Sequence, residues 1–398
     1  MTTHAPDDIV VAAARRTPLG AFMGAFSSTP ATDLGAAAIR AVLDDTGIGA
    51  SDVCEVLMGC VLPAGQGQAP ARQAAKSAGL ANSVGATTVN KVCGSGMKAV
   101  MLGHDLIRAG SAKIVLAGGM ETMSSAPFLL PKMRRGHKAG STEVLDHMIM
   151  DGLEDAYEHG RPMGDFGEAT AQSYGFTRTQ QDRFAAETLK RAQQALSTGA
   201  FDNECTPVTV TGRKTTTTIT RDERPERIDV AKIPDLRAAF GAEGTITAAS
   251  SSANADGAAA LVLTRASEAD ARGLPTMARI IGHTTHSQDP AWFTTAPIPA
   301  IRALLQKIGW QAEDVDLFEI NEAFAVVAMA TAQEIGIPRE KLNVNGGACA
   351  LGHPIGATGA RILVTLIHAL KARGLKRGVA CLCIGGGEAT AVAVEVPE

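Results

Sequence analysis

The sequence predicts an α/β protein built from two related α/β domains that pack against each other, with a loop region inserted between them. The first observation is an internal repeat, because residues 38–53 and 300–315 are identical at nine of sixteen positions. The second is that near-continuous apolar strands alternate with helical segments, which is typical of parallel sheets covered on both faces. The third is the length of 398 residues, which exceeds one ordinary hydrophobic core.

The first domain is predicted to begin with an apolar strand at residues 9–11 and to continue into the first copy of the repeat. That copy has the pattern of an amphipathic helix with a glycine stop, followed by a strand at 56–58. A glycine-rich turn, a helix that ends at Gly110 and a strand at 114–119 come next. The apolar run 258–264 is expected to return as a buried strand, so this domain comprises residues 1–123 and about 249–273.

The second domain, residues 274–398, repeats this order with a strand at 317–320, a glycine-rich turn and helix at 353–374, and a strand at 379–386. Residues 124–248 form the inserted region, which is less regular. It contains a basic loop at 132–138, a helix at about 179–197, strand-like runs at 208–210 and 215–218, and a charged stretch at 220–227. Long insertions tend to carry substrate or subunit contacts.

Composition excludes several classes of function. A net charge of −4 gives no electrostatic case for nucleic acid, and no apolar run is long enough to span a bilayer. Residues 1–8 do not resemble a secretion signal, and the seven cysteines are an odd number spread through a long chain. We therefore expect a cytoplasmic protein with free thiols and without disulfides.

Cys93 lies between a predicted strand and a predicted helix, in the stretch Asn90-Lys-Val-Cys-Gly-Ser-Gly-Met. Val89 and Val92 suit a buried strand end, and Gly94 and Gly96 would allow a close backbone approach. Unpaired N–H groups at a helix start favour negative charge, so the thiol is expected to ionise more easily than a free cysteine. The alternative is a small buried cysteine that serves only packing.

Three further glycine-rich or polar stretches follow predicted strands or open a helix, where open α/β sheets place their sites. They are Asn321-Glu-Ala-Phe, residues 346–356 with His353, and Cys383-Ile-Gly-Gly-Gly. Each alone has a structural interpretation: Asn321 as a helix cap, His353 as a loop histidine, and Cys383 as strand packing. A metal site of Cys381, Cys383 and His353 is not expected, because the ligand spacing of structural zinc sites is absent.

Taken together and in this order, the stretches VCGSGMKA, NEAF, GHPIGATGAR and CIGGG resemble the thiolase family. The similarity extends through residues 61–75, 117–127 and 344–354, and so covers essentially the whole chain. It implies two duplicated domains packed as αβαβα layers. It also implies an acyltransferase that needs no cofactor and no metal, whose substrates are coenzyme A (CoA) thioesters.

The resemblance also implies roles for individual residues. Cys93 would be the nucleophile that becomes acylated, His353 would take its proton, and Cys383 would be the second acid/base. The N–H groups of Cys93 and Gly385 would form one oxyanion hole, while His353 and a water held by Asn321 would form the other. Ionising either of the two thiols should oppose ionisation of the other.

For CoA, Ser252 matches the serine of the family's pantetheine-contacting segment at 247–252. The other residues predicted to contact CoA or the acyl group are Ala248, Ala323, Phe324, Phe240, Met163 and Phe293, with Arg224, Arg227 and Lys232 for the nucleotide end. The chain departs from relatives at three places. It has Ser-Ser-Ser-Ala at 250–253 in place of Asn-Ala-Ser-Gly, Pro162 in place of a pocket histidine, and Phe293 where some relatives have methionine.

The predicted activity is the reversible condensation of two acetyl-CoA molecules to acetoacetyl-CoA and CoA, a reaction of fatty acid metabolism, by a homotetramer built as a dimer of dimers. One alternative is a longer-chain 3-ketoacyl-CoA thiolase of fatty-acid breakdown, and another is a non-catalytic lipid carrier. A decarboxylating ketoacyl synthase would be expected to use a second histidine where this chain has Asn321 and Cys383. A nicotinamide dehydrogenase would need a G-x-G-x-x-G fingerprint, and the first predicted strand leads instead to Ala14-Arg-Arg-Thr-Pro.

Overall fold

The computed structural model describes residues 5–212 and 215–397; residues 1–4, 213–214 and 398 of the predicted domains lie outside it. Its central feature is a sheet in the order β12-β13-β14-β11-β1-β10-β5-β3-β4, with β2 paired to β10. The N-terminal half consists of β1 (Ile9–Arg16), β2 (Gly20–Ala21), β3 (Glu55–Gly59), β4 (Gly85–Val89), β5 (Ile114–Thr122) and β10 (Ala255–Arg265). The C-terminal half consists of β11 (Ala278–Ser287), β12 (Leu317–Ile320), β13 (Arg377–Ile384) and β14 (Glu388–Glu395).

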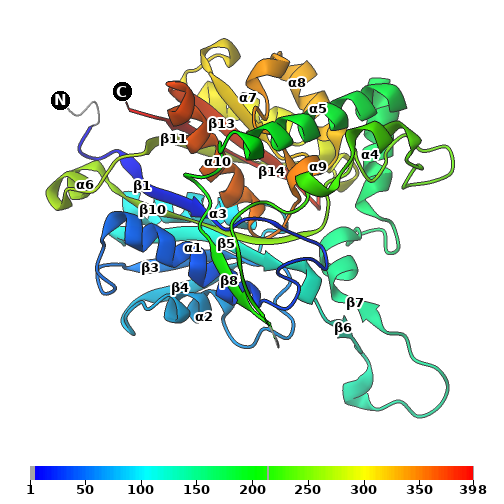
Figure 1. Cartoon of the computed structure of the whole chain (residues 1–398), viewed down its shortest axis with the longest axis horizontal. Helices are drawn as coiled ribbons and strands as arrows, with labels where there is room; N and C mark the ends of the chain where they lie inside the picture. The colour runs from blue at the N-terminus through cyan, green and yellow to red at the C-terminus, as the bar shows by residue number, and fades with distance from the viewer. Residues whose placement is uncertain (1–4, 213–214, 398) are drawn as a thin grey trace.

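The two halves join where β1 pairs with β11 over two register positions, Val10 with Arg279 and Val11 with Ala278. Helices α3 (Ser95–Arg108) and α10 (Thr358–Arg373) contact each other and lie between the two halves (Figure 1). Their apolar side chains share one core with both halves of the sheet. Helices α1 (Ala31–Thr46) and α2 (Pro70–Ser77) cover the outer face of the first half, and α7 (Pro297–Ile308) and α8 (Ala325–Ile335) that of the second. The predicted αβαβα layers are confirmed.

The internal repeat maps onto matching elements of the two halves. The first copy is α1 and the loop to β3, and the second is α7 and the loop to β12. The glycine shared by both copies ends its helix in each: Gly47 has φ 65° and Gly309 has φ 72°. Residues with a Cβ adopt this left-handed conformation only with strain, so the glycine stop is a physical requirement of both copies. Between β10 and β11 lies the short α6 (Ala266–Arg272).

The strand before Cys93 differs from the prediction. β4 is the last strand of the sheet and ends at Val89, which is only partly buried. Val92 is not a strand residue, because its φ is 45°, a left-handed conformation. Residues 258–264 form the buried strand that was expected, and this strand, β10, lies between β1 and β5.

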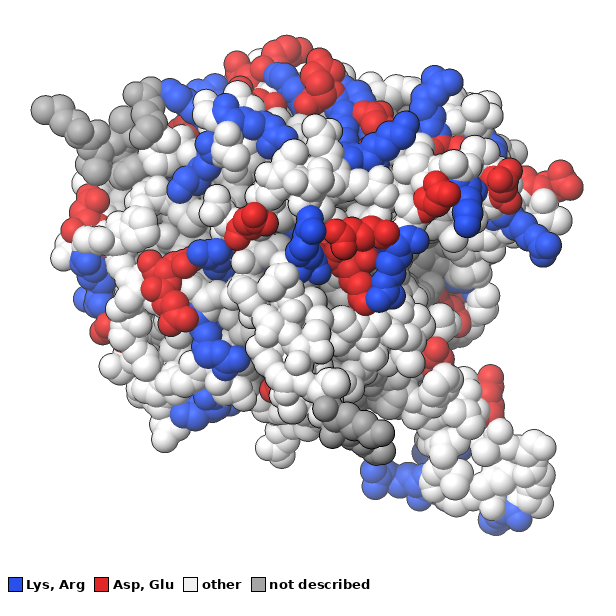
Figure 2. All heavy atoms as spheres, in the orientation of Figure 1, with Lys and Arg blue, Asp and Glu red and all other residues white. Residues whose placement is uncertain are grey.

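The inserted region contains α4 (Met163–Tyr174), α5 (Arg178–Ser197), and the hairpin of β8 (Val208–Thr211) and β9 (Thr216–Ile219). Its first part forms a projection, residues 128–146, that begins with β6 (Phe128–Leu129) and ends with β7 (Leu145–Asp146) (Figure 1). The predicted basic loop lies in this projection, where Figure 2 shows a group of Lys and Arg side chains. The division into three domains stays a prediction.

Within the described residues, no helix combines the length and the apolar character that crossing a bilayer requires. The remaining regular helix, α9 (Ala348–Leu351), is a single turn beside the loop that carries His353.

Candidate active site

The structure brings the four predicted stretches together beside a cavity of about 340 Å³. Cys93 follows β4, Asn321 follows β12, Gly385 follows β13, and His353 precedes α10. The cavity is lined by residues from two of these stretches and from other loops, among them His353, Ile355, Phe324, Ser252, Met163 and Phe240. Cys93 packs against an apolar cluster that contains Ile355, one of the residues that line the cavity. A cavity of this size suits a small acyl group on an extended carrier.

Backbone hydrogen bonds hold the converging loops in register. Ser252 N–H donates to Ala323 O at 2.9 Å, and His353 N–H donates to Ala253 O at 2.8 Å. Asn321 N–H donates to Cys381 O at 2.9 Å, which ties this loop to β13. The position of the site is therefore set by main-chain contacts between segments that are far apart in the sequence.

The turn at Cys93 is compact. Ser95 N–H donates to Val92 O at 3.0 Å, and the Ser95 hydroxyl accepts the Lys91 N–H at 2.8 Å. A Cβ on Gly94 would lie 2.3 Å from a side-chain carbon of Ile384, and one on Gly96 would lie 2.9 Å from the backbone N of Ala360. Both glycines are needed for space, as predicted.

The expectation that the Cys93 thiol is unusually acidic is wrong. Burial raises the pKa of Cys93 to about 11, although the N–H groups of Gly385 and of Cys93 itself favour the thiolate. The loss of water outweighs these donors because a thiolate is strongly hydrated in solution. In the resting site Cys93 is a neutral thiol at pH 7, and it needs a base in order to react.

The family resemblance predicts that His353 is this base, and its role stays a prediction. It is 5% exposed, and burial, with Arg361 nearby, lowers the pKa of its imidazole to about 3. Its Nδ1 lies 2.7 Å from the Thr358 hydroxyl, which donates its own hydrogen to Pro354 O at 2.9 Å. Nδ1 must therefore be the protonated nitrogen, which leaves the Nε2 lone pair free to accept a proton.

Asn321 lies on the Nε2 side of His353. Its Nδ2 is 3.5 Å from His353 Nε2. Its Oδ1 is buried and accepts no hydrogen bond from the described residues. A buried polar atom without a partner is rare, and this one supplies the acceptor that holding a water requires. The predicted role of Asn321 stays a prediction.

Cys383 is 1% exposed at the end of β13. Burial raises the pKa of its thiol well above the ordinary value, and the neighbouring Cys93 and then Cys381 raise it further. Cys93 and Cys383 therefore oppose each other's ionisation, in the direction predicted. Gly385 begins the turn between β13 and β14, where Gly386 and Gly387 have φ of 92° and 87°.

Four of the predicted CoA or acyl contacts line this cavity: Met163, Phe240, Phe324 and Ser252. Phe240 meets Phe324 edge to face with ring centroids 5.9 Å apart. Ala323 is 7% exposed, and Phe293 is 3% exposed and packs edge to face on Phe166. These two belong to the apolar wall that also contains Cys383.

The remaining predicted contacts lie elsewhere. Arg224 and Ala248 line a separate pocket of about 200 Å³. The Arg224 guanidinium donates to the carbonyls of Cys349, Ala350 and Ala248, so it braces these loops. Arg227 is exposed and paired with Glu223, and Lys232 is exposed.

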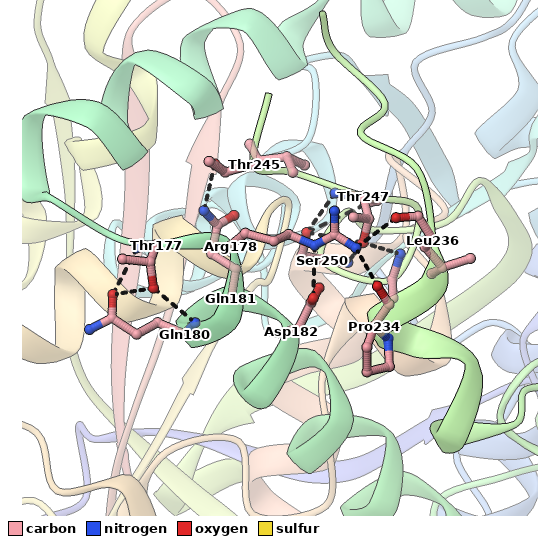
Figure 3. Close-up of polar contacts among 12 residues, drawn as sticks. Thr177, Arg178, Gln180, Gln181, Asp182, Pro234, Leu236, Thr245, Thr247 and Ser250 are labelled. Carbon is pink, nitrogen blue, oxygen red and sulfur yellow. Dashed lines mark hydrogen bonds and ion pairs between the residues drawn. The ribbon is translucent and has the colours of Figure 1, made fainter. Parts of the chain in front are cut away.

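The loop that leads to Ser252 is anchored to the start of α5 (Figure 3). Arg178 Nη2 donates to Leu236 O at 2.6 Å, and its Nε donates to Asp182 at 2.7 Å. Gln181 Nε2 donates to the Thr245 hydroxyl at 2.7 Å. Thr247 N–H then donates to the Ser250 hydroxyl at 2.8 Å, which shapes the turn just before Ser252.

One residue beside the site, Glu121, was not predicted from the sequence. Glu121 at the end of β5 is fully buried, and its carboxylate accepts the N–H groups of Val61 at 2.9 Å, Leu62 at 3.2 Å and Gly356 at 2.9 Å. Burial raises the pKa of Glu121 to about 7, although these donors favour the ionised form. The carboxylate joins the loop after β3 to the loop of His353. Its position in a run of apolar strand residues was the available signal.

Replacing Glu121 by Ala should lower the free energy of unfolding by about 3 kcal/mol, because three buried N–H groups would lose their acceptor. The loss of kcat should be larger than the change in KM, since the loop of His353 would lose an anchor. Urea unfolding and steady-state kinetics would measure both effects. Glu121→Gln, which keeps one acceptor oxygen, should lie between wild type and Glu121→Ala; an Ala variant as stable as wild type would contradict this role.

Comparison with known proteins finds matches to both halves of the chain. Residues 9–267 match the family model "Thiolase, N-terminal domain", and residues 274–396 match "Thiolase, C-terminal domain". The chain belongs to the thiolase family. Among curated thiolase relatives, the acetyl-CoA acetyltransferase of Schizosaccharomyces pombe is 47% identical over 98% of both chains. That of Escherichia coli is 48% identical over 97% of this chain and 98% of its own.

A solved thiolase structure gives the same result for the fold. The crystal structure of the Bacillus anthracis acetyl-CoA acetyltransferase superposes with a TM-score of 0.96 at 38% identity. The match covers 99% of this chain and 100% of that one.

Proposed function

We propose that this thiolase is an acetyl-CoA C-acetyltransferase, which condenses two acetyl-CoA molecules to acetoacetyl-CoA and CoA and also catalyses the reverse reaction. The observation that carries the proposal is that two thiols, Cys93 and Cys383, and one imidazole, His353, meet beside one cavity. The names of the relatives at 47% and 48% identity support the short-chain substrate over the longer-chain alternative. The reaction belongs to the short-chain end of fatty acid metabolism.

In the first half-reaction, His353 Nε2 takes the proton of Cys93, and the sulfur attacks the thioester carbonyl carbon. A carbon–sulfur bond forms to Cys93, and the bond to the CoA sulfur breaks. The N–H groups of Cys93 and Gly385, which already point toward the Cys93 sulfur, would stabilise the oxyanion. The leaving CoA sulfur takes the proton of Cys383, which leaves a Cys383 thiolate beside a protonated His353.

In the second half-reaction, the Cys383 thiolate removes a proton from the α-carbon of a second acetyl-CoA. The resulting enolate oxygen would be held by the His353 N–H and by a water on Asn321. The α-carbon then attacks the acetyl carbonyl, the Cys93 sulfur leaves, and it recovers its proton from His353. Protons and charges balance over the cycle.

The two thiols are electrostatically coupled. A charge on Cys93 raises the pKa of Cys383. Because the acyl group makes Cys93 a neutral thioester, no thiolate at Cys93 opposes the ionisation of Cys383 in the second half-reaction.

The test is the Cys383→Ala variant mixed with acetyl-CoA. We expect one acetyl group per chain to form on Cys93 and to accumulate, while condensation falls by a factor on the order of 10³ or more. Mass spectrometry would follow the adduct, and a CoA-release assay would follow turnover. The Cys381→Ala variant, two residues away on the same strand, is the matched control and should keep both activities. Normal turnover in Cys383→Ala would refute the assignment.

We also propose a homotetramer whose dimers are tied together by the projection at 128–146. The projection exposes several large apolar side chains, among them Phe128 at 68% and Val144 at 54%. Such side chains on an extended hairpin suit a protein–protein contact. Light scattering at micromolar concentration should give the mass of a tetramer, and a monomer would contradict the proposal.

The proposed cycle draws its nucleophile, base and N–H donors from the chain, so it needs no cofactor beyond the CoA thioesters. It also requires Cys93 and Cys383 to stay reduced. A cytoplasmic, reducing location supports that chemistry, and we propose it for this reason.

A further inference from the structure

A group of three metal-binding side chains lies at the far end of α3 from Cys93. His104 and Asp105 belong to the last turns of α3, and His283 belongs to β11. Their donor atoms, one from each residue, all lie within 4.8 Å of one another. None of these residues takes part in the proposed reaction.

We propose that His104, Asp105 and His283 form a site for a divalent transition-metal ion of the Zn²⁺ and Co²⁺ class. The distances between donor atoms fit such an ion. His104 Nδ1 and His283 Nε2 each lie 3.0 Å from Asp105 Oδ1, and the two nitrogens lie 3.3 Å apart. Two donors on a tetrahedral ion at about 2.0–2.2 Å are separated by about 3.3–3.5 Å, so small side-chain shifts would admit the ion.

The ligand set also fits such an ion. Two imidazole nitrogens and one carboxylate oxygen are a set that Zn²⁺ and its neighbours prefer. The two nitrogens would bind the ion through their lone pairs, in place of the hydrogen bonds that they make to Asp105 Oδ1.

The exposure of the three residues leaves room for water on the ion. The side chains of His104 and His283 are 15% and 14% exposed, whereas that of Asp105 is 54% exposed. The nearby Lys307, whose Nζ donates to His283 O at 3.0 Å, adds a positive charge that opposes a tight site. We therefore expect an open, three-ligand site.

A bound ion would join the central helix α3 to a strand of the C-terminal half. Residues 104 and 105 lie on one side of this junction and residue 283 on the other. A ligand that binds only the folded form stabilises it, so metal should raise the melting temperature of the protein.

The test uses the tag-free full chain, treated with a chelator and then titrated with Co²⁺. Calorimetry should give one Co²⁺ per chain, and the visible spectrum should show nitrogen and oxygen ligands without a thiolate charge-transfer band. In His283→Ala and in Asp105→Asn the Kd should rise at least about tenfold, and the rise in melting temperature with Co²⁺ should disappear. The matched control is His286→Ala, a partly buried histidine on the same strand, which should bind Co²⁺ like wild type.

Asp105→Asn changes an exposed side chain and should fold normally, as a melting curve without metal would check. Absence of Co²⁺ binding by the wild type would overturn the proposal. Binding that survives both variants would also overturn it, and a thiolate band would overturn it by placing the ion on a cysteine.

Discussion

Replacing Cys93 by Ala should abolish the covalent intermediate and lower kcat/KM by a factor on the order of 10⁴ or more. The reason is that the acyl group would have no sulfur to accept it: Cys383 is buried, and burial raises the pKa of its thiol well above the ordinary value. Mixing the wild type with acetyl-CoA should add one acetyl group per chain, and this mass should be absent in Cys93→Ala. Peptide mapping should locate the adduct at residue 93.

The control for this experiment is Cys54→Ala, because Cys54 is the exposed cysteine among the free thiols of the chain. This variant should acetylate like the wild type, since Cys54 does not accept the acyl group in the proposed reaction. An adduct on Cys54, or an adduct that persists in Cys93→Ala, would mean that the nucleophile has been misassigned.

Replacing His353 by Asn should slow acylation of Cys93 at pH 7 by roughly 10²- to 10⁴-fold. A thiol with a pKa of about 11 is ionised in only about one molecule in 10⁴ at pH 7, so without a base the reaction depends on this small fraction.

The pH dependence of the acylation rate distinguishes a role of His353 as the base from a purely structural role. In the wild type, the imidazole has a pKa of about 3 and the thiol a pKa of about 11, so both stay in their neutral, reactive forms from about pH 5 to pH 9. The acylation rate should be nearly constant over this range. In His353→Asn it should rise about tenfold per pH unit, following the thiolate fraction. Rapid-quench mass spectrometry would measure the rates.

The matched control is His286→Asn, which alters a histidine on β11 outside the cavity lining and should keep the constant profile. A constant but uniformly slower profile in His353→Asn would indicate damage to the structure of the site. In that case His353 would not be the base.

The local features of the site could be predicted from the sequence because they depend on a few neighbouring residues. The helix stops at Gly47 and Gly309, and the turn at Cys93 with its two glycines, follow from steric limits on the backbone. The repeat and the alternation of strands and helices predicted two related α/β domains, and the resemblance to thiolases implied the αβαβα layers. The order of the four stretches along the chain was enough to recognise the thiolase family.

The pKa values and the hydrogen-bond partners of the site residues depend on burial, and the tertiary structure decides them. The start of a helix lowers the pKa of a thiol locally, but segments from the other half of the chain exclude water from Cys93 and raise its pKa to about 11. Similarly, the charge of Arg224 suggested a contact with the nucleotide end of CoA. In the structure its guanidinium donates to backbone carbonyls instead.

By itself, then, the sequence determined the layers, the glycine-dependent turns and the identity of the chemical groups. The tertiary structure determined their protonation states and partners, including the three N–H groups on Glu121 and the approach of His283 to His104 and Asp105. The physical reason is range: steric limits act between adjacent residues, whereas desolvation and charge depend on every segment that surrounds a group.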